Sequence, residues 1–208
     1  GTSAGAAIAV ATFDGDITAY IGDNTQIGQV SGNTIGDVSV IADLNVDVEV
    51  DAWAVAAGMT NGFAINVGVI DIASSVEAYL GENVTAIATG DVTVKALTQT
   101  KLDAGVWGVT VSTGLAMGAS FASVALTLDM DAYIGSSSTI SSSGGGLAIE
   151  AAHNKDAGSA KADAMASGGG YYAGNGALAN VSLDVSVDAG IGQNVLITVT
   201  DDISILAT

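Results

Sequence analysis

A four-residue phrase recurs along the chain at nearly constant spacing, and this recurrence limits the possible folds more than any other feature. Three copies read Ala-Tyr-Ile-Gly or Ala-Tyr-Leu-Gly and begin at Ala19, Ala78 and Ala132, and a degenerate copy, Ala-Gly-Ile-Gly, begins at Ala189. Successive copies therefore start 59, 54 and 57 residues apart (19 to 78, 78 to 132, 132 to 189). Such spacing is typical of repeat architectures, in which each unit buries its apolar face against its neighbours. We interpret residues 1–208 as one repeat domain, with approximate repeats 1–60, 61–114, 115–175 and 176–208.

The segment 37–57 shows the internal pattern of one repeat most clearly. Apolar side chains occupy alternate positions: Val38, Val40, Ala42, Leu44, Val46, Val48 and Val50. Acidic or amide side chains occupy the positions between them: Asp43, Asn45, Asp47, Glu49 and Asp51. A period of two over this length predicts a β-strand with one buried face.

The same element begins again in each later repeat, in matching register. Three columns result: Val38, Val92, Leu147 and Ile203; then Val40, Val94, Ile149 and Ile205; then Ala42, Ala96, Ala151 and Ala207. A second long strand is expected before each turn (7–21, 63–80, 121–134 and 178–191), followed by a short strand (84–89 and 195–200). Identical positions stack only in parallel register, so we predict an all-β parallel β-solenoid of about four coils, each of about 57 residues, about 4.8 Å apart. The alternative is an antiparallel meander or sandwich of long hairpins.

Two local features qualify this prediction. Strands usually run about 3–10 residues, so we expect each long strand to be broken by a bend or bulge at Gly or Asn. The segments Gly28–Gly36 and Gly168–Tyr172 are glycine-rich and are predicted to be loops.

The charge composition restricts the partners. Asp and Glu total 22 against four lysines and no arginine, a net charge of −18. Nucleic acids and anionic membranes bind through clustered basic side chains, so we expect neither as a partner, and we expect no membrane insertion. The chain lacks cysteine, which excludes disulfides and thiolate metal sites.

Two columns of amides are candidates for hydrogen-bonded ladders along the solenoid axis. Asn24, Asn83 and Asn194, with Ser137 in the third repeat, follow the Ile-Gly or Leu-Gly turn. For this column a preference of Asn for turn dihedrals explains the pattern equally well. Asn45, Gln99 and Asn154 share a position in the acidic strand and form the second column.

Aromatic residues also recur in register. Tyr20, Tyr79 and Tyr133 lie within the recurring phrase, and Trp53 and Trp107 each follow a repeat aspartate by 16 residues (37 to 53 and 91 to 107). We predict that both sets are packing columns. A carbohydrate platform is the alternative for the tryptophans.

The acidic stripe Asp43, Asp47, Glu49 and Asp51 is the one candidate metal site, for calcium, which takes oxygen ligands. A solvated face is the competing interpretation, since the proposed register sets Lys101 between Asp47 and Asp156. No other cofactor is expected. The single histidine, His153, lacks a catalytic motif around it, so we do not expect an enzyme.

The string Ala-Tyr-Ile-Gly-Asp-Asn, followed after a connection by Gly-Asp-Val-Ser-Val-Ile-Ala, resembles the repeats of giant bacterial surface and secreted proteins, the leukotoxin- and haemagglutinin-like adhesins. The matching stretches are Ala19–Ala42, Ala78–Ala96, Ala132–Ala151 and Ala189–Ala207. The resemblance implies an extracellular or cell-surface β-solenoid shaft without catalytic residues, with an adhesin module for glycans or another surface as the alternative. We also expect head-to-tail continuation through open sheet edges, by identical protomers or by adjacent repeats of a longer chain.

Overall fold

A computed structural model describes residues 1–28, 35–155 and 158–208. The described residues form strands and turns and contain no helix. Every pair of neighbouring strands is parallel. The all-β parallel solenoid is therefore confirmed, and the antiparallel meander is wrong.

Each coil consists of a long strand, a short strand and a return strand. Coil one contains β1 (Thr2–Ile21), β2 (Gln26–Ile27) and β3 (Val38–Gly58). Coil two contains β4 (Asn61–Leu80), β5 (Thr85–Ala88) and β6 (Val92–Ser112). Coil three contains β7 (Leu115–Ile134), β8 (Thr139–Ser142), β9 (Leu147–His153) and β10 (Ser159–Gly169). Coil four contains β11 (Tyr172–Ile191), β12 (Leu196–Thr198) and β13 (Ile203–Ala207).

Three parallel sheets result from the stacking of these coils. The first sheet has the order β1-β4-β7-β11, and the third has the order β12-β8-β5-β2. In the second sheet, β6 pairs with β3 on one side and with β9 and β10 on the other, and β13 pairs with β9. The three predicted columns are confirmed residue by residue, as in Val38–Val92–Leu147–Ile203.

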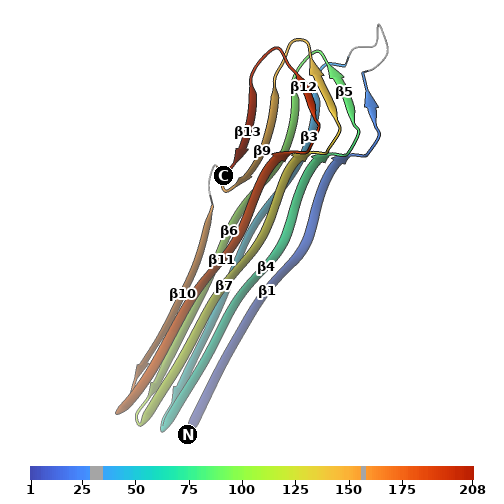
Figure 1. The fold of residues 1–208 in the computed structure, drawn as a ribbon. Coiled ribbons are helices and arrows are strands. Elements are labelled where there is room, and N and C mark those ends of the chain that lie inside the picture. Colours follow the sequence, from blue (N-terminus) through green and yellow to red (C-terminus); the bar gives the residue numbers. More distant parts are fainter. Residues whose placement is uncertain (29–34, 156–157) are drawn as a thin grey trace.

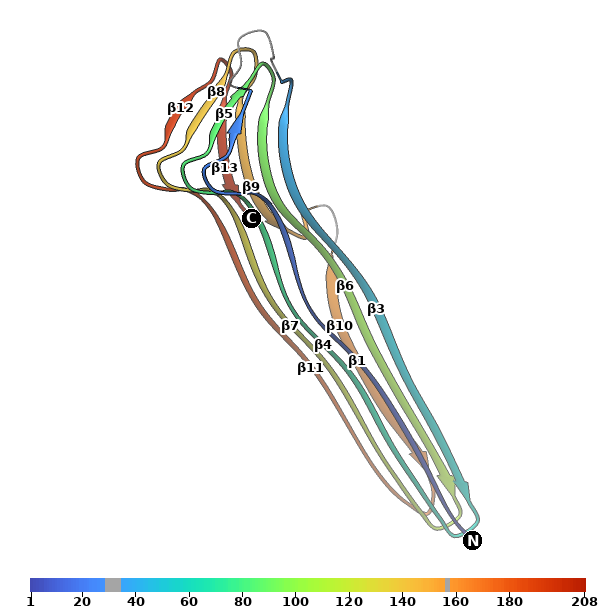
Figure 2. The same ribbon diagram turned by 90° about the vertical axis from the view of Figure 1, so that its right-hand side faces the viewer.

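The coils are long and flat. The first and second sheets lie face to face over most of the length, and the short strands of the third sheet widen one end (Figure 1). The view turned by 90° shows the short strand of each coil to the left of that coil's return strand, as β5 lies to the left of β6 (Figure 2). The strands thus run across the stack, perpendicular to the direction in which coils are added.

The core of the wide end and the adjoining part of the shaft consists of large aliphatic side chains. Alternation in β3 places its even-numbered residues inward, as predicted, although Val48 is only half-buried. The largest fully buried side chains come from all three sheets: Ile70, Ile72, Leu80, Leu102, Leu128, Met130, Ile134, Ile140, Leu147 and Ile149. Their burial supplies the main hydrophobic stabilisation of the fold.

The opposite end of the shaft is different, and we call it the uncharged blade: residues 2–11, 52–70, 106–124 and 164–181. It contains no Asp, Glu, Lys or Arg. Its interior is built from small residues, so the two sheets approach closely. A Cβ atom on Gly68 would lie 2.6 Å from Val106 Cγ2, and one on Gly108 would lie 2.4 Å from Asn66 Nδ2. We call the rest of the described chain the acidic half.

The structure corrects the expectations about breaks and loops. The strands β1, β3, β4, β6, β7 and β11 run unbroken for 20 or 21 residues. The return strand of coil three is interrupted after His153, and the next residue, Asn154, has a φ of 51°. Gly168 and Gly169 belong to β10, so the predicted loop 168–172 shrinks to Gly170 and Tyr171. Most of the predicted loop 28–36 lies outside the described residues.

Candidate functional site

The tyrosine column is a continuous stack along the first sheet. The ring centroids of Tyr20 and Tyr79 are 5.3 Å apart, those of Tyr79 and Tyr133 are 5.0 Å apart, and the ring planes of both pairs are nearly parallel, 12° and 2° apart. Tyr133 donates a hydrogen bond from its hydroxyl to Glu77 Oε1 at 2.9 Å. Burial, and then this bond to a carboxylate, raise the pKa of Tyr133. The column ends at Gly190, which pairs with Tyr133.

The tryptophans pair across the second sheet on its outer surface. Trp53 and Trp107 are direct neighbours in the register, with ring centroids 4.7 Å apart and planes tilted by 36°. Trp53 remains 66% exposed. A Cβ atom on Gly105 would lie 2.1 Å from the Trp107 ring, so this glycine makes room for the indole above the sheet. The pair therefore offers an open aromatic surface.

The first amide column lies at turns with left-handed backbone. Asn24, Asn83, Ser137 and Asn194 have φ values of 57°, 54°, 61° and 57°. Successive turns are joined by main-chain hydrogen bonds, such as Asn24 N–H to Glu82 O at 2.8 Å. The side-chain amides of this column form no hydrogen bond with one another in the described residues. The tolerance of Asn for these dihedrals accounts for the column.

The second amide column is interrupted in coil three. Asn45 and Gln99 are register neighbours. Asn154 instead directly follows β9, accepts a hydrogen bond from the Thr100 N–H at 2.7 Å and donates one to Thr100 Oγ1 at 3.2 Å. Its amide therefore satisfies the backbone where the strand is interrupted and does not extend a ladder from Gln99.

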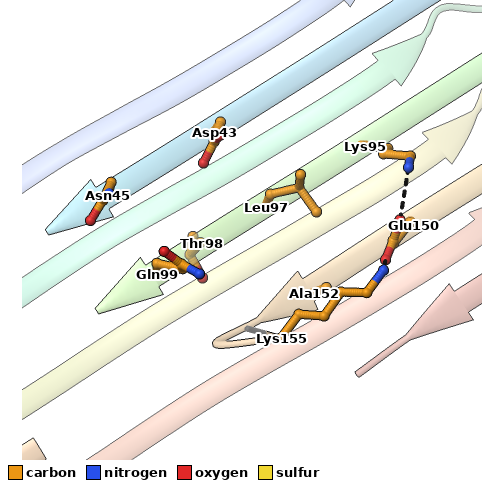
Figure 3. A pocket seen from close by; sticks show the side chains of 9 residues that line it. All are labelled: Asp43, Asn45, Lys95, Leu97, Thr98, Gln99, Glu150, Ala152 and Lys155. Carbon is orange, nitrogen blue, oxygen red and sulfur yellow. Dashed lines mark hydrogen bonds and ion pairs between the residues drawn. The ribbon is translucent and has the colours of Figure 1, made fainter. Parts of the chain in front are cut away.

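Figure 3 shows a polar pocket on the outer surface of the second sheet. Its volume is about 360 Å³, and Asn45, Gln99 and Asp43 contribute to its lining. The only buried carboxylate of the described chain, Glu150, also lines it. Lys95 forms an ion pair with Glu150 at 3.1 Å, and Lys155 forms a second ion pair with the same carboxylate.

The two lysines of the pocket act on the carboxyl of Glu150. The hydrogen bond from Lys155, together with Lys95, holds the pKa of the Glu150 carboxyl below its ordinary value, although burial acts in the opposite direction. We did not single out Glu150 from the sequence. A signal was present, because the position after the Val40–Val94–Ile149 column reads Ile41, Lys95 and Glu150.

The acidic stripe lies on the exposed face of β3. Asp47 is an ion-pair partner of Lys101 at 3.3 Å, and both side chains are 63% exposed. The predicted third member, Asp156, lies outside the described residues. Glu49 is the register neighbour of Asp103, which Lys161 approaches to 3.8 Å. Among the residues that the structure describes, no three His, Cys, Asp or Glu side chains converge to hold a metal ion.

The histidine is engaged in local hydrogen bonds. His153 Nδ1 lies 2.9 Å from Thr98 Oγ1, and its Nε2 lies 2.8 Å from Asn154 Nδ2. Burial lowers the pKa of His153, which favours the neutral ring. Thr98 also lies 3.2 Å from Met130 Sδ, so this cluster closes the core at the strand interruption.

Comparison with known proteins gives no match: no family model, no curated protein and no solved structure resembles the chain significantly. The described residues contain no helix that is long and apolar enough to cross a membrane.

Proposed function

We propose that this chain is a structural, non-catalytic segment of an extracellular shaft or fibre in a bacterial surface or secreted protein. One observation carries the proposal: equivalent side chains lie directly above one another in parallel register through all three sheets. Such a stack has no intrinsic end, because the two sides of each coil carry complementary rows of backbone donors and acceptors, so a further coil can pair with the last one.

The open edges support this role. Coil one leaves β1, β2 and β3 at one side of the stack, and coil four leaves β11, β12 and β13 at the other. Within the described residues no strand pairs with these outer sides. Edge backbone of this length is a template for further strands. The partner is an adjacent repeat of a longer chain or an identical protomer, joined head to tail.

Side-chain chemistry supports a role without catalysis. The buried carboxylate Glu150 is neutralised by two lysines, and His153 is held by Thr98 and Asn154. The acidic groups of β3 point outward along an exposed strand and leave no enclosed reactive centre in the part of the chain described here. The resemblance to giant adhesin repeats points to the cell exterior.

Stacking is tested by removing one edge donor. The carbonyl of Ile21 accepts a hydrogen bond from the Gly81 N–H, so the backbone groups of Ile21 point towards β4. Successive residues of a strand point their backbone groups to opposite sides, so the even-numbered residues near this end of β1, including Thr18, point theirs to the open edge. Thr18→Pro removes an outward N–H without breaking a bond to β4, and Thr18→Ala is its matched control. We expect negative-stain microscopy to show fibres of the wild type and of Thr18→Ala, and single particles of Thr18→Pro. Single particles of all three proteins would contradict protomer stacking.

An adhesin module that binds glycans is a second candidate, and the exposed pair Trp53 and Trp107 favours it. Aromatic faces are common carbohydrate platforms because sugar C–H groups pack against them. A glycan array probed with wild type, Trp53→Ala and the control Val55→Ala tests this candidate. Val55 is 67% exposed on the same strand face. Binding that is lost only in Trp53→Ala supports the adhesin role, and the absence of binding by the wild type contradicts it.

A further inference from the structure

The uncharged blade buries polar side chains beside its small apolar ones and carries large apolar side chains on its outward faces. Buried positions between its sheets include Asn66, Thr110 and Ser120. Large apolar side chains instead point outward: Ile8, Val10, Trp53, Val55, Phe63, Ile65, Val109, Val111, Met117, Met165, Tyr172 and Leu178. The outward apolar side chains add little to the stability of a monomer, since burial of apolar area is what stabilises a fold.

The outward surface of the first sheet carries one continuous part of this apolar area. We call it the apolar blade face: Ala6, Ile8, Val10, Phe63, Ile65, Val67, Val69, Met117, Ala119, Phe121, Gly176 and Leu178. It extends over four adjacent strands in exact parallel register. Ile8 is 73% exposed, and Ile65 and Leu178 are each 59% exposed.

This face has a ridge beside a pit. The ridge is the register row Ile8–Val67–Phe121–Leu178, and the neighbouring row is Ala6–Ile65–Ala119–Gly176. Because Ala119 and Gly176 are small, they form the floor of a pit of about 350 Å³ whose walls include Phe121 and Leu178. A ridge and a pit two residues apart on one strand form a self-complementary pair.

The area of the face sets the strength of the contact. At most seven residues per strand, as in 63–69 of β4, at about 3.3 Å by four strands at about 4.8 Å give a face of at most about 440 Å². The largest apolar patch on a typical monomer is about 300–600 Å², and a stable interface buries about 800 Å² per partner. Four coils therefore support a weak contact, and each further coil would add to its area.

We propose that the apolar blade face packs against the same face of a second copy of this chain, related by a two-fold axis, with the ridge of each copy in the pit of the other. Two flat sheets pack this way about 10 Å apart. Lipid is a poorer occupant, because the backbone groups at the open edges of β1 and β11 would lack partners in hydrocarbon. This contact lies beside the stack and is independent of coil addition along it.

The oligomeric state tests the proposal. We expect sedimentation of the wild type over about a hundredfold concentration range to show a monomer–dimer equilibrium. In the double variant I65D/L178D the dissociation constant should rise at least about tenfold, because each copy then buries carboxylates in the contact. Thr127→Asp, on an exposed outward position of β7 in the acidic half, should dimerise like the wild type.

Three results would overturn the proposal: a wild type that is monomeric throughout, a double variant that dimerises unchanged, or association abolished by Thr18→Pro but retained in I65D/L178D. A wild type that floats with phosphatidylcholine vesicles while staying monomeric would assign the face to lipid instead.

A second measurement does not depend on a disruptive substitution. Since the chain has no cysteine, Ala119→Cys places a single thiol on the pit floor. Its labelling by a maleimide should slow several-fold as protein concentration rises, whereas a Thr127→Cys thiol should react at a constant rate. Equal behaviour of the two thiols contradicts the proposed contact.

Discussion

Strand β7 packs Leu128 inward and Asp129 outward in the acidic half, but Ser120 inward and Phe121 outward in the uncharged blade. The backbone pairing is the same in both regions, with 20 residues of β7 in register with β4. The pairing of repeats therefore does not depend on which face carries the large side chains. The acidic half is stabilised by burial within one chain, whereas the blade combines backbone pairing with apolar surface available to a partner.

Truncation of large side chains in the two regions gives the largest expected contrast. Leu128→Ala opens a cavity at a side chain only 2% exposed and should cost about 2–5 kcal/mol. Met117→Ala removes an outward side chain, 46% exposed, from the same strand and should change monomer stability by less than about 1 kcal/mol. Urea denaturation at low protein concentration measures both. Equal losses would mean that the two regions do not differ.

Overpacking of the blade tests the close approach of its sheets. Gly108→Ala would place a Cβ atom 2.4 Å from Asn66 Nδ2 and 3.0 Å from Ser120 Oγ. We expect a loss of about 1–3 kcal/mol from the resulting shift of the sheets. Gly174→Ala, also in the blade, meets nothing within 4 Å and should be neutral or slightly stabilising. If both variants melt like the wild type, the blade core is loosely packed.

Neutralising Glu150 tests the only buried carboxylate of the described residues. Glu150→Gln weakens the contacts with Lys95 and Lys155 and should cost about 1–3 kcal/mol at neutral pH. Asp47→Asn, in an exposed pair, should cost less than about 0.5 kcal/mol.

The pH dependence of this difference follows from the lowered pKa of Glu150. The folded state binds the proton less readily than the unfolded state, so the stabilisation is present above the ordinary value of 4.5. It should disappear as the pH falls below that value through the folded pKa. A stability gap between wild type and Glu150→Gln that persists in strong acid would contradict the ion-pair explanation.

Divalent cations should have the smallest effect, and only through the acidic half. Repulsion among 22 acidic side chains against four lysines should be relieved by calcium at the outward stripe of β3. We expect the melting temperature to rise by about 2–4 °C relative to chelator, which corresponds to about 1 kcal/mol. A matched sodium salt is the control. Identical melting in all three solutions would leave the stripe as a solvated face.

The repeat phrase and the period-two pattern predicted most of the fold. The column Ala42–Ala96–Ala151–Ala207 could be read from the sequence because each repeat contributes its own copy. The breaks were predicted poorly, since stacking in register keeps strands of 20 residues straight enough to pair without bulges. Asn154 was assigned to an amide ladder because its neighbour in the pattern, Gln99, lies in an unbroken strand.

The polarity of the blade was not predicted, for a physical reason. Alternation identifies the buried face only when the two faces differ in polarity, as they do between Asp43 and Asp51. Around Phe63–Val69 both faces are uncharged, so sequence alternation leaves the inward face undetermined. The close approach at Gly68 and Gly108 decides it, and that approach depends on the opposing sheet.

The register of the coils has a kinetic consequence. Residues that pair across a coil boundary are 54 to 59 positions apart in the first two coils, roughly a quarter of the chain length. Closing the first loop of this size costs at least about 3.5 kcal/mol of conformational entropy, before the hydrogen bonds between paired strands can offset that cost. Folding should therefore begin slowly, with a rare event that joins two coils. Each later coil can then pair with strands that are already ordered, so folding should spread from that nucleus quickly, one coil at a time along the stack.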